Sequence, residues 1–140
     1  MKEAIFIASD HAGFNLKRDL IMAKSYNFLD LGTFNNESVD YPDYAKDLVL
    51  KINSNPNSKG ILICGSGVGM AIAANRDKKI RAGLAFNPEI AKLIRSHNDA
   101  NVLVLPGRFM NIQDALKCVE NFINTEFEAG RHQNRILKIE

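Results

Sequence analysis

The sequence has no tryptophan, only two cysteines and three histidines, and no apolar run of about 18 residues that could cross a membrane. Two cysteines cannot build the disulfide framework of a small secreted protein, and the apolar stretch near the N-terminus is too short for a signal peptide. The net charge of +2 gives no reason to expect nucleic acid or a membrane surface as a partner. We therefore expect residues 1–140 to form a single cytoplasmic domain that is an enzyme or a binding protein.

Short apolar runs alternate along the chain with segments of helical periodicity. The runs predict strands at about 4–8, 28–31, 61–64, 81–86 and 101–105, and the periodic segments predict helices at about 14–24, 41–52, 69–75, 88–96, 112–125 and 131–139. This alternation indicates the α/β class, with a five-stranded parallel sheet between two layers of helices. We expect the strand order 2-1-3-4-5, which places the first and third strands side by side where ligands bind, beyond the carboxyl ends of the strands.

The most distinctive stretch is a cysteine followed by a glycine-rich turn, in the segment GILICGSGVGMAIAAN (60–75). Cys64 ends the third predicted strand, and Gly65, Gly67 and Gly69 lead into a run of good helix formers. Strand, glycine turn and helix start together make an anion site, because backbone N–H groups can approach a ligand closely there. The same setting favours the thiolate form of a cysteine. Cys118, in contrast, lies at an apolar position of a predicted helix, so we interpret it as a core residue.

The spacing of this turn excludes several common motifs. A dinucleotide-binding fingerprint needs its third glycine at the position of Met70, and a P-loop needs a lysine after the glycines. A cysteine phosphatase loop needs an arginine six residues after the cysteine, again at Met70. A response regulator needs an aspartate after the third strand and a lysine after the fifth, where this chain has Cys64 and Arg108. The turn is therefore predicted to be an anion-binding loop of another kind.

Asp10 and His11 follow the first predicted strand, so the predicted strand order brings them close to Cys64. Asp10 alone could simply cap the following helix. The pair could also belong to a metal site, but no third and fourth ligands occur at suitable spacing. We therefore expect neither a metal nor another cofactor, and we expect the functional site where these two loops meet.

Three arginines indicate a phosphorylated substrate. Arg131 and Arg135 are four residues apart on one predicted helix face, and Arg108 follows the fifth predicted strand. Surface arginines are usually solvated, but three of them suit a phosphate group through bidentate hydrogen bonds. His97 and Asn98 end the fourth predicted helix, at the wrong end of the sheet for a strand-tip site. If they act in catalysis, they must reach over or serve a neighbouring subunit.

These features fall in six segments of the chain: SDHAG (9–13), DLGT (30–33), DYP (40–42), ICGSGVG (63–69), HNDAN (97–101) and GRHQNR (130–135). Their combination, which covers nearly the whole chain, resembles the type B ribose-5-phosphate isomerases. The wider family includes the galactose-6-phosphate isomerase subunits. The resemblance implies a Rossmann-like three-layer α/β/α sandwich and a metal-free aldose–ketose isomerase that interconverts ribose 5-phosphate and ribulose 5-phosphate. It also implies a homodimer or homotetramer whose active sites are shared between two chains.

The resemblance further implies roles for individual residues. Cys64 is the base that moves a proton between C1 and C2 through a cis-enediolate, and Ser66 assists near the reacting carbons. His97 is the acid that opens the furanose ring, with Asp10 as a partner or as the alternative proton donor. The binding residues are, for substrate hydroxyls, Tyr41 and Asn98; for the developing negative charge, the backbone of Gly65, Ser66, Gly67, Val68 and Gly69; and for the phosphate, His11, Arg108, Arg131 and Arg135.

Two departures separate this chain from parts of the family. One branch lacks the cysteine and carries a glutamate at the position of Met70, so this sequence is typical of the thiol branch. Pro106 stands where relatives often carry glycine or another small residue. Two alternative functions stay open: an isomerase for a six-carbon sugar phosphate such as allose or galactose 6-phosphate, and a non-catalytic phosphosugar-binding subunit. The complete set of cysteine, histidine and arginines argues against the second alternative.

Overall fold

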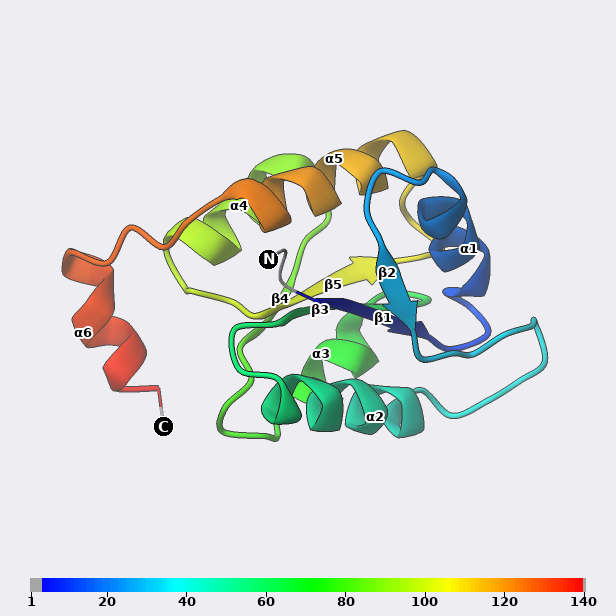
Figure 1. Ribbon diagram of the computed structural model, residues 1–140, viewed down its shortest axis with the longest axis horizontal. Coiled ribbons are helices and arrows are strands. Elements are labelled where there is room, and N and C mark those ends of the chain that lie inside the picture. Colours follow the sequence, from blue (N-terminus) through cyan, green and yellow to red (C-terminus); the bar gives the residue numbers. More distant parts are fainter. Residues whose placement is uncertain (1–3, 140) are drawn as a thin grey trace.

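A computed structural model describes residues 4–139 and contains a five-stranded parallel sheet covered by helices (Figure 1). The strands are β1 (Ile5–Ser9), β2 (Phe28–Asp30), β3 (Lys59–Cys64), β4 (Ala82–Leu84) and β5 (Val102–Pro106). The helices are α1 (Phe14–Met22), α2 (Tyr41–Ser54), α3 (Val68–Ala74), α4 (Pro88–Ser96), α5 (Ile112–Asn124) and α6 (Arg131–Leu137). Every predicted element is present, with ends that differ by a few residues, so the α/β class is confirmed.

The order of the strands corrects one prediction. The sheet runs β2-β1-β3-β5-β4, so the predicted order 2-1-3-4-5 is wrong for the last two strands. β5 is buried along its whole length, whereas the three residues of β4 are all half-exposed. A fully apolar strand belongs inside a parallel sheet and a short, partly exposed strand belongs at its edge. The order therefore follows burial rather than position in the chain. β1 and β3 are neighbours, as predicted.

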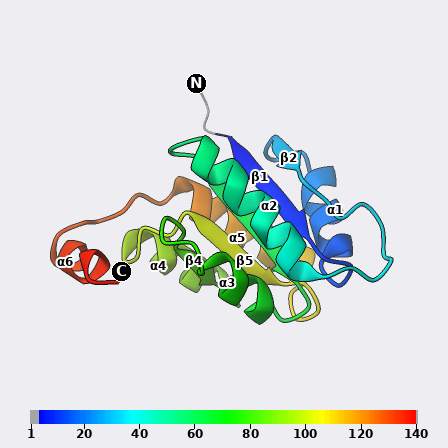
Figure 2. The ribbon, with the colours of Figure 1, turned by 90° about the horizontal axis from the view of Figure 1, so that it is seen from below.

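The helices form two layers, as Figures 1 and 2 show. Helices α1, α4 and α5 cover one face of the sheet, with Leu20 and Phe122 fully buried in their core. Helices α2 and α3 cover the other face, around Leu48 and Met70. Right-handed crossovers require this division, because the chain moves one way along the sheet through α2 and α3, and the other way through α1 and α4. The three-layer α/β/α sandwich is therefore confirmed.

Local chemistry explains where several helices begin. Pro42 and Pro88 occupy the first turns of α2 and α4, where the missing N–H group is not needed. The side chain of Asn87 accepts a hydrogen bond from the Ile90 N–H at 2.9 Å, which makes Asn87 the N-cap of α4. Asn111 caps α5 in the same way, with its side chain accepting from the Asp114 N–H at 2.8 Å.

Helix α6 lies apart from the two layers, at the end of an extended segment (Figures 1 and 2). None of the main packing contacts between elements involves α6. It is linked to the end of α4 by a hydrogen bond from the Glu128 N–H to the Ser96 carbonyl oxygen at 3.0 Å and by a ring contact between His97 and His132. Over residues 4–139, no helix is both long enough and apolar enough to span a membrane.

Candidate active site

The turn after Cys64 is shaped by close contacts that only glycine permits. Gly67 is the N-cap of α3 with a φ of 81°, in the left-handed region that favours glycine. A Cβ atom on Gly67 would also lie 2.4 Å from the side chain of Leu84. The Ser66 hydroxyl accepts a hydrogen bond from the Val68 N–H at 3.3 Å, which tightens the turn. The N–H groups of Gly69 and Met70, in the first turn of α3, have no acceptor within the helix, so they are available to an anion at this end of the sheet.

Asp10 lies beside this turn, in the loop after β1. Its Oδ1 accepts hydrogen bonds from the N–H groups of Ala12 (2.9 Å) and Gly13 (3.0 Å), so part of the carboxylate does serve the start of α1. The Asp10 N–H donates to the Ile63 carbonyl oxygen at 3.2 Å, which ties the loop to the strand that ends in Cys64. Because Oδ2 takes no hydrogen bond from residues 4–139, the helix start uses only one of the two carboxylate oxygens.

The corrected strand order places Arg108 directly over the glycine turn. Pro106 pairs with Cys64 in the sheet, and the N–H groups of Gly107 and Arg108 donate to the carbonyl oxygens of Cys64 (2.8 Å) and Gly65 (3.0 Å). The guanidinium Nη1 lies 3.3 Å from the position that a Cβ on Gly65 would take. Pro106 therefore does not keep Arg108 away from the glycine turn. Arg108, which follows β5, is exposed, and its guanidinium lies beside Gly65.

Two more predicted residues complete this carboxyl-edge cluster. Tyr41 begins α2, and its ring lies against Gly69, since a Cβ there would be 2.6 Å from ring carbons. The Val39 N–H donates to Nδ1 of His11 at 3.2 Å. In the neutral imidazole this bond puts the proton on Nε2, so His11 offers a donor from its free nitrogen. The structure thus brings together Cys64, Asp10, His11, Tyr41, Arg108 and the backbone of residues 65–69.

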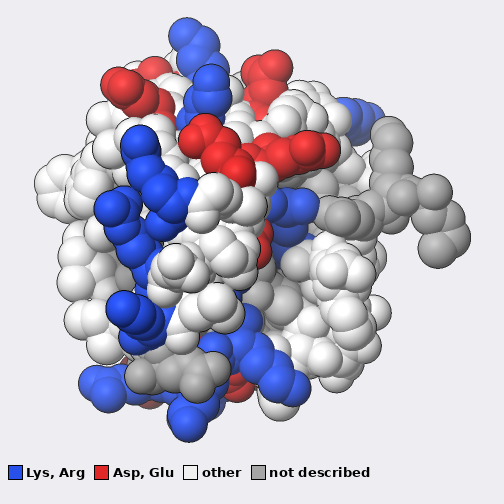
Figure 3. Space-filling view, turned by 90° about the vertical axis from the view of Figure 1, so that its left-hand side faces the viewer, with Lys and Arg blue, Asp and Glu red and all other residues white. Residues whose placement is uncertain are grey.

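The remaining predicted residues lie at the opposite edge of the sheet. His97 follows the last residue of α4 and precedes β5, whereas Cys64 ends β3. A six-residue strand such as β3 spans about 16 Å, so His97 and Asn98 do not join the Cys64 cluster within one chain. Arg131 and Arg135 lie with them, exposed on α6. Figure 3 shows this end of the molecule, where Lys and Arg side chains form a band across the surface.

His97 stacks on His132, with ring centroids 4.3 Å apart and planes 17° apart. His132 is buried, and burial lowers its pKa below the ordinary 6.5; the positive charges of His97, Arg131 and Arg135 act in the same direction, against Glu128. His132 is therefore favoured in its neutral form. This contact was not predicted from the sequence, because residues 97 and 132 are far apart in the chain and no spacing pattern links them.

One group of side chains could hold a metal ion: His97, Glu128 and His132 have ligand atoms within 4.8 Å of one another. However, the lone pairs of two stacked imidazoles lie in two separate and nearly parallel planes, so they do not converge on one point between the rings. Tetrahedral zinc, in contrast, needs converging ligands at about 2.0–2.2 Å. The arrangement fits a histidine pair held by stacking better than a preformed metal centre.

The second cysteine behaves as predicted. Cys118 is fully buried in α5, and burial together with Asp114 raises its pKa to about 12. Its thiol therefore stays protonated near neutral pH and serves as a core residue. Cys64, which is 5% exposed at the end of β3, is the one cysteine that borders the carboxyl-edge cluster.

Comparisons with known proteins agree with this geometry. The family described as Ribose/Galactose Isomerase matches residues 5–139. Ribose-5-phosphate isomerase B of Escherichia coli strain K12 is 39% identical over 142 residues, which cover 99% of this chain and 95% of that protein.

Solved structures extend the similarity to the fold. The crystal structure of a ribose 5-phosphate isomerase from Thermotoga maritima is 51% identical, with a TM-score of 0.94, and the match covers 99% of this chain and 98% of that one. Ribose-5-phosphate isomerase B from Mycoplasma genitalium, solved with bound ribulose-5-phosphate, is 43% identical, with a TM-score of 0.91 over 99% and 95% of the two chains. This chain belongs to the ribose/galactose isomerase family and, within it, to the type B ribose-5-phosphate isomerases.

Proposed function

We propose that this protein interconverts ribose 5-phosphate and ribulose 5-phosphate, with residues 1–140 acting as one sugar-phosphate isomerase domain in the cytoplasm. The observation that carries the proposal is the position of Cys64, at the end of β3, beneath a glycine turn and beside Asp10 and Arg108. A base, an anion-binding turn and a guanidinium at one strand edge are what a phosphorylated sugar needs for a proton transfer between neighbouring carbons.

In this mechanism the Cys64 thiolate removes the proton from C2 of the open aldose and returns it to C1, while the hydroxyl proton on O2 passes to O1, to give the ketose. Between these steps the substrate is a cis-enediolate, whose negative charge the backbone N–H groups of residues 65–69 stabilise. Ser66 lies in the same turn and assists near the reacting carbons. The proton stays within the site, so neither an oxidant nor a reductant is consumed, and we expect no cofactor.

The residues for ring opening and part of the phosphate site come from a second copy of the chain. His97 and Asn98 lie at the far edge of the sheet, about 16 Å from Cys64 along β3, and α6 extends beyond the body with Arg131 and Arg135. A neighbour that inserts this edge above the Cys64 turn would add its arginines to His11 and Arg108. We propose a homodimer, or a homotetramer of such dimers, with sites shared in this way.

An exposed apolar surface supports such an assembly. Val68 and Ile72, on one side of α3, are 46% and 56% exposed, and Phe86, just after β4, is 55% exposed. Ile90 of α4 is 37% exposed. These elements lie next to one another at the β4 edge of the sheet (Figure 2). Large apolar side chains gathered at a sheet edge are typical of a protein–protein interface.

The experiment that tests the proposal is an initial-rate assay of ribose 5-phosphate conversion, with a metal chelator present, for the natural protein and Cys64→Ala. We expect the natural protein to be active and the variant to lose about 100- to 10,000-fold in kcat, the range for loss of a general base. The matched control is Cys118→Ala, which removes a thiol that stays protonated in the core and should keep its activity.

Three outcomes of this assay would change the proposal. A Cys64→Ala variant that keeps most of its rate would remove the cysteine from the base role. A natural protein that is inactive on ribose 5-phosphate but active on allose 6-phosphate would leave the family in place and change the substrate. A folded protein that binds these sugars without converting any of them would favour the phosphosugar-binding subunit.

A further inference from the structure

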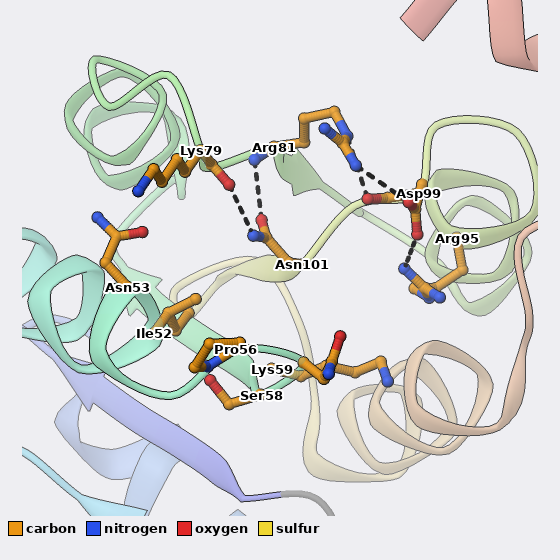
Figure 4. Close-up of a pocket in the computed structure, with 11 residues that line it drawn as sticks. Ile52, Asn53, Pro56, Ser58, Lys59, Lys79, Arg81, Arg95, Asp99 and Asn101 are labelled. Atoms are coloured by element: carbon orange, nitrogen blue, oxygen red, sulfur yellow. Dashed lines mark hydrogen bonds and ion pairs between the residues drawn. The ribbon is translucent and has the colours of Figure 1, made fainter.

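A polar cavity of about 480 Å³ lies at the amino-terminal edge of the sheet, at the opposite end from Cys64. Figure 4 shows its walls: the end of α2 and the loop into β3 on one side, and the segments that lead into β4 and β5 on the other. None of the carboxyl-edge residues lines it. Cavities of roughly 300–1,000 Å³ are the size that holds small metabolites.

The charge of the cavity is positive. Arg81 and Arg95 both bind the carboxylate of Asp99, at 3.0 Å and 2.9 Å, so one negative charge is divided between two guanidiniums (Figure 4). Lys79 also lines the cavity, and its ammonium group has no partner among residues 4–139. Asp99 is the one carboxylate in the lining. These groups leave the cavity with an excess of positive charge that a bound anion would balance.

Ser58 gives a second and independent indication of a ligand. Its residue is 6% exposed and lines the cavity, yet its hydroxyl oxygen is buried without a hydrogen-bond partner in the described part of the chain. A buried hydroxyl without a partner costs roughly 1–3 kcal/mol, so such groups are normally paired with protein, water or a ligand. A buried hydroxyl in the wall of a cationic cavity can donate a hydrogen bond to an oxygen of a bound anion.

We propose that this cavity binds a small anion that carries a phosphate group. The Ser58 hydroxyl and the Lys79 ammonium would donate hydrogen bonds to the phosphate oxygens, and the free N–H groups of Arg81 and Arg95 would face the same charge. The two guanidiniums and the ammonium group surround a small cavity, which favours a compact anion over an extended polymer. The proposal does not depend on the isomerase reaction, since the cavity shares no residue with the carboxyl-edge cluster.

The test is an amide NMR titration of the full-length isotope-labelled protein with inorganic phosphate as the probe. The amides of residues 65–69 report the carboxyl-edge site, and those of Ser58, Lys59 and Lys79 report the cavity. We expect the chemical shifts of the cavity amides to saturate, with a dissociation constant of about millimolar order. Their titration curve should differ from that of residues 65–69. Lys79→Ala and Ser58→Ala should each weaken binding at the cavity by about fivefold or more, while residues 65–69 keep their titration curve.

The matched control is Lys78→Ala, which removes the same charge from the neighbouring exposed residue outside the cavity lining. We expect this variant to bind phosphate at the cavity as the natural protein does. Equal weakening by Lys78→Ala and Lys79→Ala would show attraction to diffuse surface charge and would overturn the proposal. Shifts confined to residues 65–69 would overturn it as well, because they would mean that the cavity holds water only.

Discussion

At the scale of single residues, two ion pairs that involve α1 show how burial determines the contribution of an ion pair to stability. Lys17 of α1 is 1% exposed, and its Nζ lies 2.6 Å from Oδ1 of Asp30 and over the ring of Phe34. Asp30 also accepts the Gly32 N–H at 2.9 Å. The next two residues of the helix, Arg18 and Asp19, form a pair in which both side chains are more than 40% exposed. The first pair connects α1, β2 and the loop after β2, whereas the second pair connects neighbouring residues of one helix.

We predict that Asp30→Asn lowers the free energy of unfolding by about 2–3 kcal/mol, because it leaves the Lys17 ammonium buried without its counter-charge. The partial exposure of Asp30 keeps the expected loss below the 3–5 kcal/mol of a fully buried pair. The control, Asp19→Asn, should change stability by less than about 1 kcal/mol. Urea unfolding of both variants measures the difference, and equal effects would contradict the prediction.

His132 predicts a pH dependence of stability. Burial lowers its pKa in the folded protein, so the unfolded chain, with a pKa near 6.5, binds the proton more readily. The unfolding free energy should therefore fall as the pH drops through about 6.5 and stop falling below the folded pKa. His132→Gln lacks this group, so its urea midpoint should fall less over the same pH interval. Parallel curves for the two proteins would show that His132 is not the group responsible.

At the scale of elements, the start of α1 lies so close to the end of β3 that a side chain has no room. A Cβ on Gly13 would be 2.4 Å from the carbonyl oxygen of Ile63, and that atom belongs to a central strand that cannot move aside. This contact explains the glycine in the segment 9–13 without any need for an unusual backbone angle. It also fixes the loop that carries Asp10 against the strand that ends in Cys64.

We predict that Gly13→Ala destabilises the protein by about 3 kcal/mol, since overpacking against backbone cannot be relieved by a rotamer change. Gly65→Ala is the control, because its nearest neighbour would be the flexible guanidinium of Arg108 at 3.3 Å. It should lower stability by less than about 1 kcal/mol. Thermal and urea unfolding measure both variants, and a Gly13→Ala protein as stable as the control would contradict the close packing.

The sequence predicts the elements well because each has a local cause. Apolar runs predict the five strands, Asn87 and the prolines mark helix starts, and Cys118 at an apolar helix position is a core residue. The strand order depends on burial across the sheet, which local periodicity does not contain. The apolar β5, without a polar residue, and the short β4 with Gly83 are the signal that could have placed them correctly.

At the scale of the whole molecule, the candidate site falls into two halves on opposite edges of the sheet. The carboxyl-edge half could be predicted, because parallel strands bring their ends together whatever their order. The half with His97, Arg131 and Arg135 could be predicted only through the resemblance, because the fold of one chain does not bring these residues to Cys64. The hydrogen bond from the Val39 N–H to His11 joins residues far apart in the sequence, so no spacing pattern indicates it.

The proposed sharing of the site predicts complementation between two variants that we expect to be inactive, Cys64→Ala and His97→Asn. If both are unfolded and refolded together in equal amounts, half of the dimers should be mixed. Each mixed dimer would contain one site with an intact cysteine and an intact histidine, so about one quarter of the natural activity should return. The control is Cys64→Ala refolded with the double variant, which has no intact cysteine and should stay inactive. An absence of recovery in the first mixture would contradict a shared site.

The strand order also has a consequence for the time at which the site can form during synthesis. Among residues 4–139, β4 pairs only with β5, which follows it in the chain, so a nascent chain that ends before residue 102 contains a strand without its neighbour. The edge of β3 that pairs with β5 also stays unpaired until residues 102–106 have been made. Only then can Gly107 and Arg108 hold the carbonyl oxygens of Cys64 and Gly65. The loop that carries the proposed base is therefore completed late, and any nascent chain shorter than this leaves it half built.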